Sequence, residues 1–186
     1  MLHVMMLLTT PVLVGVVAGY AAGGRFANLL ALRLRRLWLL WLAAAVQVAQ
    51  YHLPWVRSLV QDELGIPMLA VVFAIVLLWV ALNVVRWPRP MQLAAVLIVL
   101  GAIGNGLAIA ANGRMPYAPQ AAVRAGLSAT VEGPKNEPAD DDTRLAFLGD
   151  VIPLPLLGKV LSAGDLLIAA GISAAVTMAL RQEPTP

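Results

Sequence analysis

The chain has 186 residues, of which 60% are hydrophobic and only 12% are charged, and its mean hydropathy is +0.81. This balance excludes an ordinary water-soluble domain and indicates a membrane protein, in which cytoplasmic arginines account for the net charge of +3, so nucleic acid is not an expected partner. Because the chain has no cysteine and only two histidines, His3 and His52, we expect no disulfide, no metal site and no cofactor.

Five apolar stretches approach the roughly 20 residues that a helix needs to cross a bilayer. They lie at residues 4–22, 37–53, 66–85, 91–111 and 160–180. Since lipid offers the backbone no hydrogen-bond partner, each stretch is expected to be helical, and the first is expected to be a retained span because no basic segment precedes it. The predicted fold class is therefore all-α: a polytopic transmembrane helix bundle of five spans, forming a single domain over residues 1–186.

The arginines predict the orientation of this bundle. The first and third connections are the ones rich in arginine, at Arg25, Arg33, Arg35, Arg36, Arg86 and Arg89. Short loops rich in Lys and Arg stay in the cytoplasm, so the N-terminus is expected outside and the C-terminus inside. The predicted localisation is a bacterial cytoplasmic membrane, crossed several times.

The long connection between the fourth and fifth spans, residues 113–159, is then an exterior loop. Its middle, "VEGPKNEPADDDTRL", combines glycine, prolines and three successive aspartates, which predicts a mobile segment. Its two ends are apolar enough to lie on the membrane surface or to tuck into the bundle.

Polar side chains inside the apolar stretches concentrate near the predicted outer surface. Two pairs each share a helix face, Gln47 with Gln50 and Asn105 with Asn112. Asp165 opens the fifth span, and Arg114 is its expected counter-ion, because an arginine fork can hold a carboxylate through two hydrogen bonds. The sequence thus predicts an outer polar site that could bind a peptide segment or a lipid headgroup.

The same residues also have structural interpretations, and the sequence leaves both open. "SAGD" places Ser162 three residues before Asp165, which is the pattern of a capping box. "ANGR" is an ordinary helix ending, with Gly113 as its left-handed cap. The glycines of "GAIGNG" favour close helix packing.

Two resemblances accompany these patterns. The order of "GGRFANLLALRLRR", "NGRMP", "LGDVIPLP" and "SAGDLLIAAG" resembles an uncharacterised family of small bacterial membrane proteins, a domain of unknown function, over nearly the whole chain. The last two spans also resemble lipoprotein signal peptidase, signal peptidase II, in "GAIGN", in "LGDVIP" around Asp150 and in "SAGDLLIAAG" around Asp165. That second resemblance implies an intramembrane aspartyl peptidase with Asp165 as one catalytic residue. No acid follows Asn105 closely, so Asp150 would have to be the second.

Two functions remain as hypotheses. The first is a non-enzymatic integral membrane protein, an accessory or scaffold subunit of a membrane assembly, with lipids, other membrane subunits, a peptide or a headgroup as partners. Its binding residues would be the polar set Asn105, Asn112, Arg114, Gln47, Gln50 and Ser162. The alternative is a peptidase that uses Asp165 and Asp150, since two carboxylates with pKa values pushed apart could activate water and protonate the leaving group.

Overall fold

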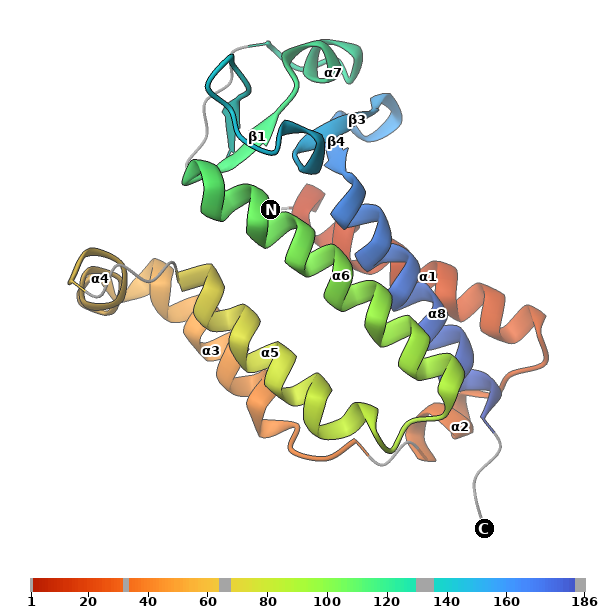
Figure 1. Cartoon of the computed structure of the whole chain (residues 1–186). Coiled ribbons are helices and arrows are strands. Elements are labelled where there is room, and N and C mark those ends of the chain that lie inside the picture. The colour runs from red at the N-terminus through yellow and green to blue at the C-terminus, as the bar shows by residue number, and fades with distance from the viewer. Residues whose placement is uncertain (1, 32–33, 64–67, 130–135, 183–186) are drawn as a thin grey trace.

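Five long helices make up most of the computed structural model, which describes residues 2–31, 34–63, 68–129 and 136–182 (Figure 1). Each of them coincides, within a few residues, with one of the five predicted apolar stretches; residues 66–67 of the third stretch lie outside the described part. They are α1 (Leu2–Ala21), α3 (Trp38–His52), α5 (Met68–Val84), α6 (Arg89–Asn112) and α8 (Ala163–Arg181). The short helices α2 (Phe26–Ala31) and α4 (Pro54–Arg57) and the π-helix η1 (Ser58–Glu63) lie in the connections.

Two helices, α6 and α8, are long and apolar enough to cross a bilayer, judged by length and composition. Apolar helical segments of 10–17 residues occur in the other three, at Thr9–Ala21, Trp38–Ala49 and Val71–Val84.

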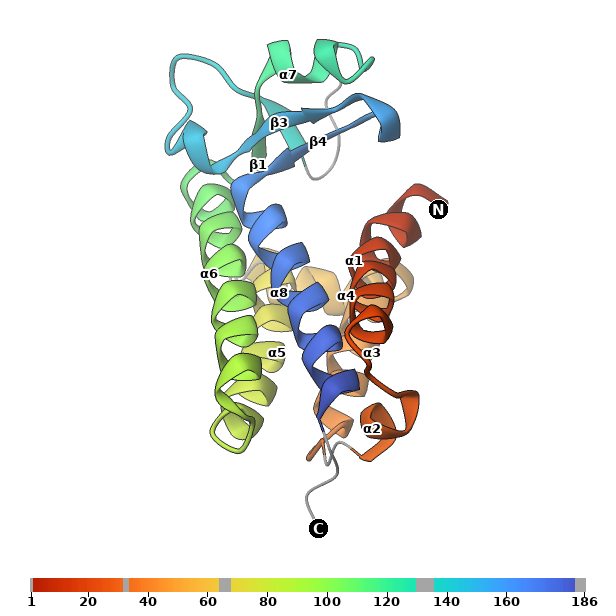
Figure 2. The same cartoon turned by 90° about the vertical axis from the view of Figure 1, so that its right-hand side faces the viewer.

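The helices form two groups. Helix α8 lies between α1 and α6 and packs along both, as two perpendicular views agree (Figures 1 and 2). Helices α3 and α5 form a separate hairpin, which approaches α6 mainly at the turn that joins α5 to α6 (Figure 1). At the far end of α8, the Leu180 carbonyl accepts hydrogen bonds from the Arg25 amide and the Asn28 side chain, both 2.8 Å, so the corner between α1 and α2 caps this helix.

Glycines allow α8 to approach both of its neighbours closely. Gly164 and Gly171 of α8 are buried against α6, whose Gly101 is buried in the same interface. On the other side, Gly15 of α1 lies against Ser173 and Val176. Small residues of this kind let helix backbones approach where no larger side chain would fit. Of the glycines in "GAIGNG", Gly101 has the predicted packing role, whereas a Cβ at Gly104 or Gly106 would meet little or nothing.

Gly171→Ala is expected to destabilise the helix pair by about 1–3 kcal/mol, because this change overpacks a tight interface. A Cβ there would lie 2.6 Å from Ile98 Cγ1 and 2.7 Å from the Ala94 carbonyl oxygen. Gly106→Ala is the matched control, since a Cβ at Gly106 meets nothing within 4 Å. Thermal unfolding in a mild detergent should show a lower midpoint only for Gly171→Ala; equal midpoints would contradict the close contact.

A small sheet covers one end of the helices, so the prediction of an all-α fold is wrong in this respect. Its four strands follow the order β2-β1-β3-β4, with β1 parallel to β2 and β3 and with β3 antiparallel to β4. They are β1 (Met115–Tyr117), β2 (Asn136–Pro138), β3 (Asp150–Leu154) and β4 (Lys159–Ser162). With the helix α7 (Pro119–Arg124) and the 3₁₀ turns η2 (Ala146–Leu148) and η3 (Pro155–Leu157), these strands form what we call the cap (Figure 2).

The cap also corrects two predicted boundaries. Much of the predicted exterior loop, residues 113–159, has regular structure, although residues 130–135 lie outside the described part. The fifth helix begins at Ala163 and not at Val160, because Val160 to Ser162 pair with β3 as strand β4. Strands of three to five residues that contain Pro116, Pro138 and Pro153 are too short for an alternating pattern to be recognised in the sequence.

Candidate functional site

The first turn of α8 carries the capping box that the sequence predicts. The Ser162 hydroxyl accepts a hydrogen bond from the Asp165 amide at 2.9 Å, and Asp165 Oδ2 accepts one from the Ser162 amide at 3.0 Å. Ser162 is completely buried. The negative charge of Asp165 also lies at the positive end of the helix dipole, so this carboxylate stabilises the start of α8.

Asn105 of α6 closes this box into a ring between two helices. Its Nδ2 donates to Asp165 Oδ1 at 2.8 Å, and its Oδ1 accepts from the Ser162 hydroxyl at 2.8 Å. The amide of Asn105 thus uses its donor and its acceptor on two neighbouring side chains of α8. Both residues belong to the outer polar set that the sequence predicts, although the expected partner of Asp165 is Arg114 and not Asn105. The hydrogen bond between Asn105 and Asp165 fixes the register between α6 and α8.

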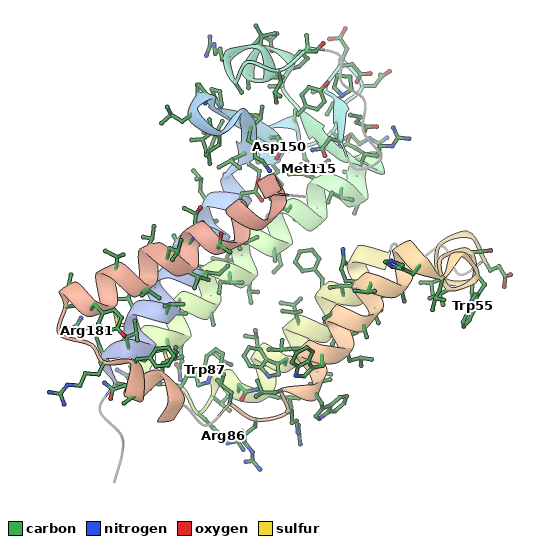
Figure 3. All side chains as sticks on the ribbon, turned by 180° about the vertical axis from the view of Figure 1, so that it is seen from behind. Trp55, Arg86, Trp87, Met115, Asp150 and Arg181 are labelled. Carbon is green, nitrogen blue, oxygen red and sulfur yellow. The ribbon has the colours of Figure 1, made fainter. Side chains whose placement is uncertain are left out.

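Asp150 lies beside this ring, at the start of β3. It pairs with Ser162 across the antiparallel strands β3 and β4, and its Oδ2 accepts a hydrogen bond from Asn136 Nδ2 at 3.0 Å. Figure 3 places Asp150 near Met115, at the junction between the helices and the cap. Two carboxylates, Asp150 at the start of β3 and Asp165 in the first turn of α8, therefore occupy one end of the bundle.

Burial raises the pKa of Asp150 from 3.8 to about 7. Desolvation is the largest cause, the nearby negative charge of Asp165 adds to it, and the hydrogen bond from Asn136 opposes it. Asp165, in contrast, accepts hydrogen bonds from Asn105 Nδ2 and from the Ser162 amide. The two carboxyl groups therefore differ in their surroundings, and burial favours the protonated form of Asp150.

Asn112 joins the end of α6 to the cap and not to the Asp165 ring. Its Oδ1 accepts from the Arg144 amide and its Nδ2 donates to the Arg144 carbonyl, both at 2.8 Å, so it ties the cap to the end of α6. Directly after it, Gly113 ends the helix in the left-handed conformation, with φ 83°, as the sequence predicts. Asn112 thus binds the cap backbone and not the Asp165 ring.

The other predicted residues lie outside the ring. Arg114 is exposed, and within the described part of the chain it forms no ion pair with Asp165; Asn105 occupies the place that the sequence assigns to this arginine. Gln47 lies on α3, which packs on α5 and not along α6 or α8. Gln50 is on the same helix, and its side chain lies outside the described part.

Asn136 is the site residue that the sequence analysis misses. It stands in a polar run beside residues 130–135, and only the parallel pairing of β2 with β1 brings it to Asp150. No local pattern signals that contact.

Chemically, the arrangement offers two carboxylates and two amides. Across the described ranges, no group of three or more His, Cys, Asp or Glu side chains is placed to hold a metal ion. The two carboxylates, Asp150 and Asp165, could bind a polar group of a ligand or activate a water molecule.

Comparison with known proteins assigns the chain to a family. No curated protein and no solved structure matches the chain. A family model described as "Family of unknown function (DUF5317)" matches residues 31–177, which include the whole of the Asn105, Asp150, Ser162 and Asp165 site. The chain therefore belongs to the DUF5317 family of unknown function, as the resemblance over nearly the whole chain predicts.

Proposed function

We propose that this protein is an integral membrane protein whose five long helices all cross the bilayer, with the cap outside. Large apolar side chains are exposed along these helices, among them Leu13 and Val17 of α1 and Trp41 of α3. An apolar surface of this extent along the long helices is unfavourable in water and favourable in lipid. Arginines gather at the end away from the cap, where Figure 3 labels Arg86 and Arg181, which agrees with a cytoplasmic end.

Single-cysteine labelling tests this orientation without background, because the chain has no cysteine. Ser128→Cys in the cap and Ala22→Cys near the opposite end are both at exposed positions. A membrane-impermeant maleimide should label Ser128→Cys in intact cells and Ala22→Cys only after the cells are opened. The reverse pattern would place the cap in the cytoplasm and refute the proposal.

Within the membrane, we propose that the protein acts without catalysis, as an accessory subunit of a larger assembly. The observation that carries this proposal is an exposed apolar stripe on α6, the side chains of Leu93, Val96, Leu100, Ile103 and Leu107. Their spacing alternates between three and four residues, which is the seam by which one helix packs along another. The stripe lies opposite the face of Gly101 and Asn105 that packs on α8, so it is available to a helix of another membrane protein.

Bulky apolar substitutions separate this role from a general effect on insertion. Val96→Trp with Ile103→Trp keeps α6 apolar but should prevent a partner helix from packing against the stripe. Val14→Trp, at an exposed position of α1, is the matched control. We expect a membrane partner to co-purify with the unaltered chain and with Val14→Trp, but not with the double variant. A monodisperse monomer extracted from native membranes would contradict the proposal.

One observation favours a second function, an aspartyl peptidase acting at the membrane surface. Asp150 and Asp165 interact electrostatically, and the pKa of Asp150 is raised to about 7. A peptidase of this class needs one carboxyl group that keeps its proton and one that is ionised. On this hypothesis, Asp165 activates water and Asp150 protonates the leaving amine.

The peptidase hypothesis predicts loss of prolipoprotein processing when Asp150 becomes asparagine, in a cell that depends on this protein. Asp142→Asn, an exposed aspartate of the cap, is the control. Unchanged processing by a folded Asp150→Asn variant would exclude the peptidase and leave the accessory role standing.

A further inference from the structure

The end of the molecule away from the cap carries a pocket of about 270 Å³, lined by Arg35, Arg36, Leu82 and Arg86. At about 30 Å³ for each water molecule, this volume corresponds to roughly nine waters, which is room for a small anion with part of its hydration shell. The three arginines are exposed, and Figure 3 shows Arg86 at this end of the bundle. The pocket shares no residue with the Asp150 and Asp165 site.

The backbone that carries Arg35 is held firmly against α5. The buried Asn83 accepts a hydrogen bond from the Arg35 amide at 2.9 Å and donates one to the Arg35 carbonyl at 3.1 Å. The indole of Trp79 donates to the same carbonyl at 3.0 Å. These contacts use only the main chain of Arg35, so its guanidinium stays available while its position is fixed.

Arg36 adopts a left-handed backbone conformation, with φ 56°, which is uncommon for a residue with a side chain. Such conformations persist where surrounding contacts hold them, and they gather at binding sites. Here the turn directly precedes α3 and helps place Arg35 and Arg36 on the same pocket as Arg86.

The charges of this pocket are not balanced. Among the described residues, none of its three guanidinium groups forms an ion pair with a carboxylate. The Arg86 side chain donates to the Leu82 carbonyl at 3.0 Å, which turns it back along α5. Three like charges around one pocket repel each other unless an anion lies between them.

We propose that this pocket binds a phosphate group through Arg35, Arg36 and Arg86. Planar guanidinium forks match phosphate oxygens, and a tetrahedral phosphate offers four oxygens, two of them ester oxygens in a phospholipid, whereas a carboxylate has only two. The phosphate could belong to the headgroup of an anionic phospholipid or be free in solution. This inference concerns the end opposite the cap and does not depend on how the Asp150 and Asp165 site functions.

Binding assays on the full chain in neutral detergent distinguish these sources. The probes are inorganic phosphate, short-chain phosphatidylglycerol and, as a carboxylate control, oleate. Each is titrated while the thermal unfolding midpoint is followed, because a ligand that binds only the folded state raises this midpoint. A rise with phosphatidylglycerol alone assigns the site to a lipid headgroup, and a rise with inorganic phosphate assigns it to a free anion.

The variants Arg35→Gln, Arg36→Asn and Arg86→Gln test the three side chains. Asparagine is chosen at position 36 because it tolerates the left-handed conformation. Each change should weaken phosphate binding roughly tenfold, which is the effect of losing one charge-assisted hydrogen bond. Arg124→Gln, at an exposed arginine of α7, should bind like the unaltered chain.

A triple lysine variant, Arg35→Lys with Arg36→Lys and Arg86→Lys, keeps the charge but removes the forks. It should lose most of the affinity for phosphate while it remains folded. Three results would each overturn the proposal: equal binding of oleate, binding by the triple lysine variant that matches the unaltered chain, or no binding of either phosphate probe.

Discussion

Asp165→Ala is expected to lower the free energy of unfolding by about 3–5 kcal/mol, the largest loss for any single substitution considered for this chain. The change removes the acceptors for Asn105 Nδ2 and for the Ser162 amide. Water cannot readily replace the lost oxygen at the Ser162 amide, since Ser162 is completely buried, and Asn105 is half-buried. The start of α8 also loses a favourable charge at its dipole.

Asp165→Asn should be nearly as harmful. One oxygen of the carboxylate becomes an NH₂ group, which then faces a donor on either side, at Asn105 Nδ2 or at the Ser162 amide. Exposed Asp140 forms hydrogen bonds only within its own turn, so Asp142→Ala, beside it and also exposed, is a control that should leave the unfolding midpoint unchanged.

A double substitution makes this prediction specific. In Asn105→Asp with Asp165→Asn, the new amide at position 165 can donate to the new carboxylate at position 105 and still accept from the Ser162 amide. The Ser162 hydroxyl can donate to position 105 as before. The double variant should therefore recover much of the stability that Asp165→Asn loses, and a double-mutant cycle measures the coupling. Additive losses would show that the ring does not act as a unit.

The contrast between Asp165 and Asp150 shows what the sequence could and could not predict. The helices and the capping box were predictable because hydrophobic stretches of about 20 residues and an S-x-x-D spacing are local patterns. The sequence also grouped Asn105 and Asp165 in one polar set, but it did not predict the ring of hydrogen bonds that joins them. The DUF5317 match confirms the family but leaves the activity open.

The cap could not be predicted in the same way. Parallel pairing of β1 with β2 and β3 joins segments that the sequence separates, and it brings Asn136 to Asp150. Arg114 was expected to pair with Asp165 because it directly follows the fourth apolar stretch, yet Asn105 on the packed face of α6 reaches Asp165 instead. Long-range strand pairing and the face that a helix buries are tertiary properties, and neither leaves a local pattern here.

Asp150 is expected to make the stability of the protein depend on pH, which is the second large effect. Its pKa in the folded protein is about 7, above its value of 3.8 in an unfolded chain, so the folded state binds the extra proton between these values. The contribution of Asp150 to stability is therefore highest at the low end of this window and falls as the pH rises from about 4 to about 7. The full shift corresponds to about 4 kcal/mol, and since Asp150 is only partly buried we expect about 2–4 kcal/mol.

Asp150→Asn should remove this dependence. The neutral amide can still accept from Asn136 Nδ2 and can donate towards Asp165, as a protonated carboxyl group would. At pH 8 the variant is expected to be more stable than the unaltered chain, whereas near pH 4 the two should be alike. Thermal unfolding midpoints across this range measure the difference, with Asp142→Asn as a control that keeps the original slope.

A gain in stability on removing Asp150 would also bear on function. Residues that lower the stability of a folded protein are commonly retained for binding or chemistry, because active sites hold groups in environments that destabilise them. Asp165 stabilises α8 and the α6 interface, whereas Asp150 places a second carboxyl group beside it, with which no cation of the described residues forms an ion pair. An unchanged pH slope in Asp150→Asn would assign the titration to another group, and the case for a functional carboxylate pair would then fail. The expected loss of that slope would make Asp150, more than Asp165, the residue whose presence the fold alone does not explain.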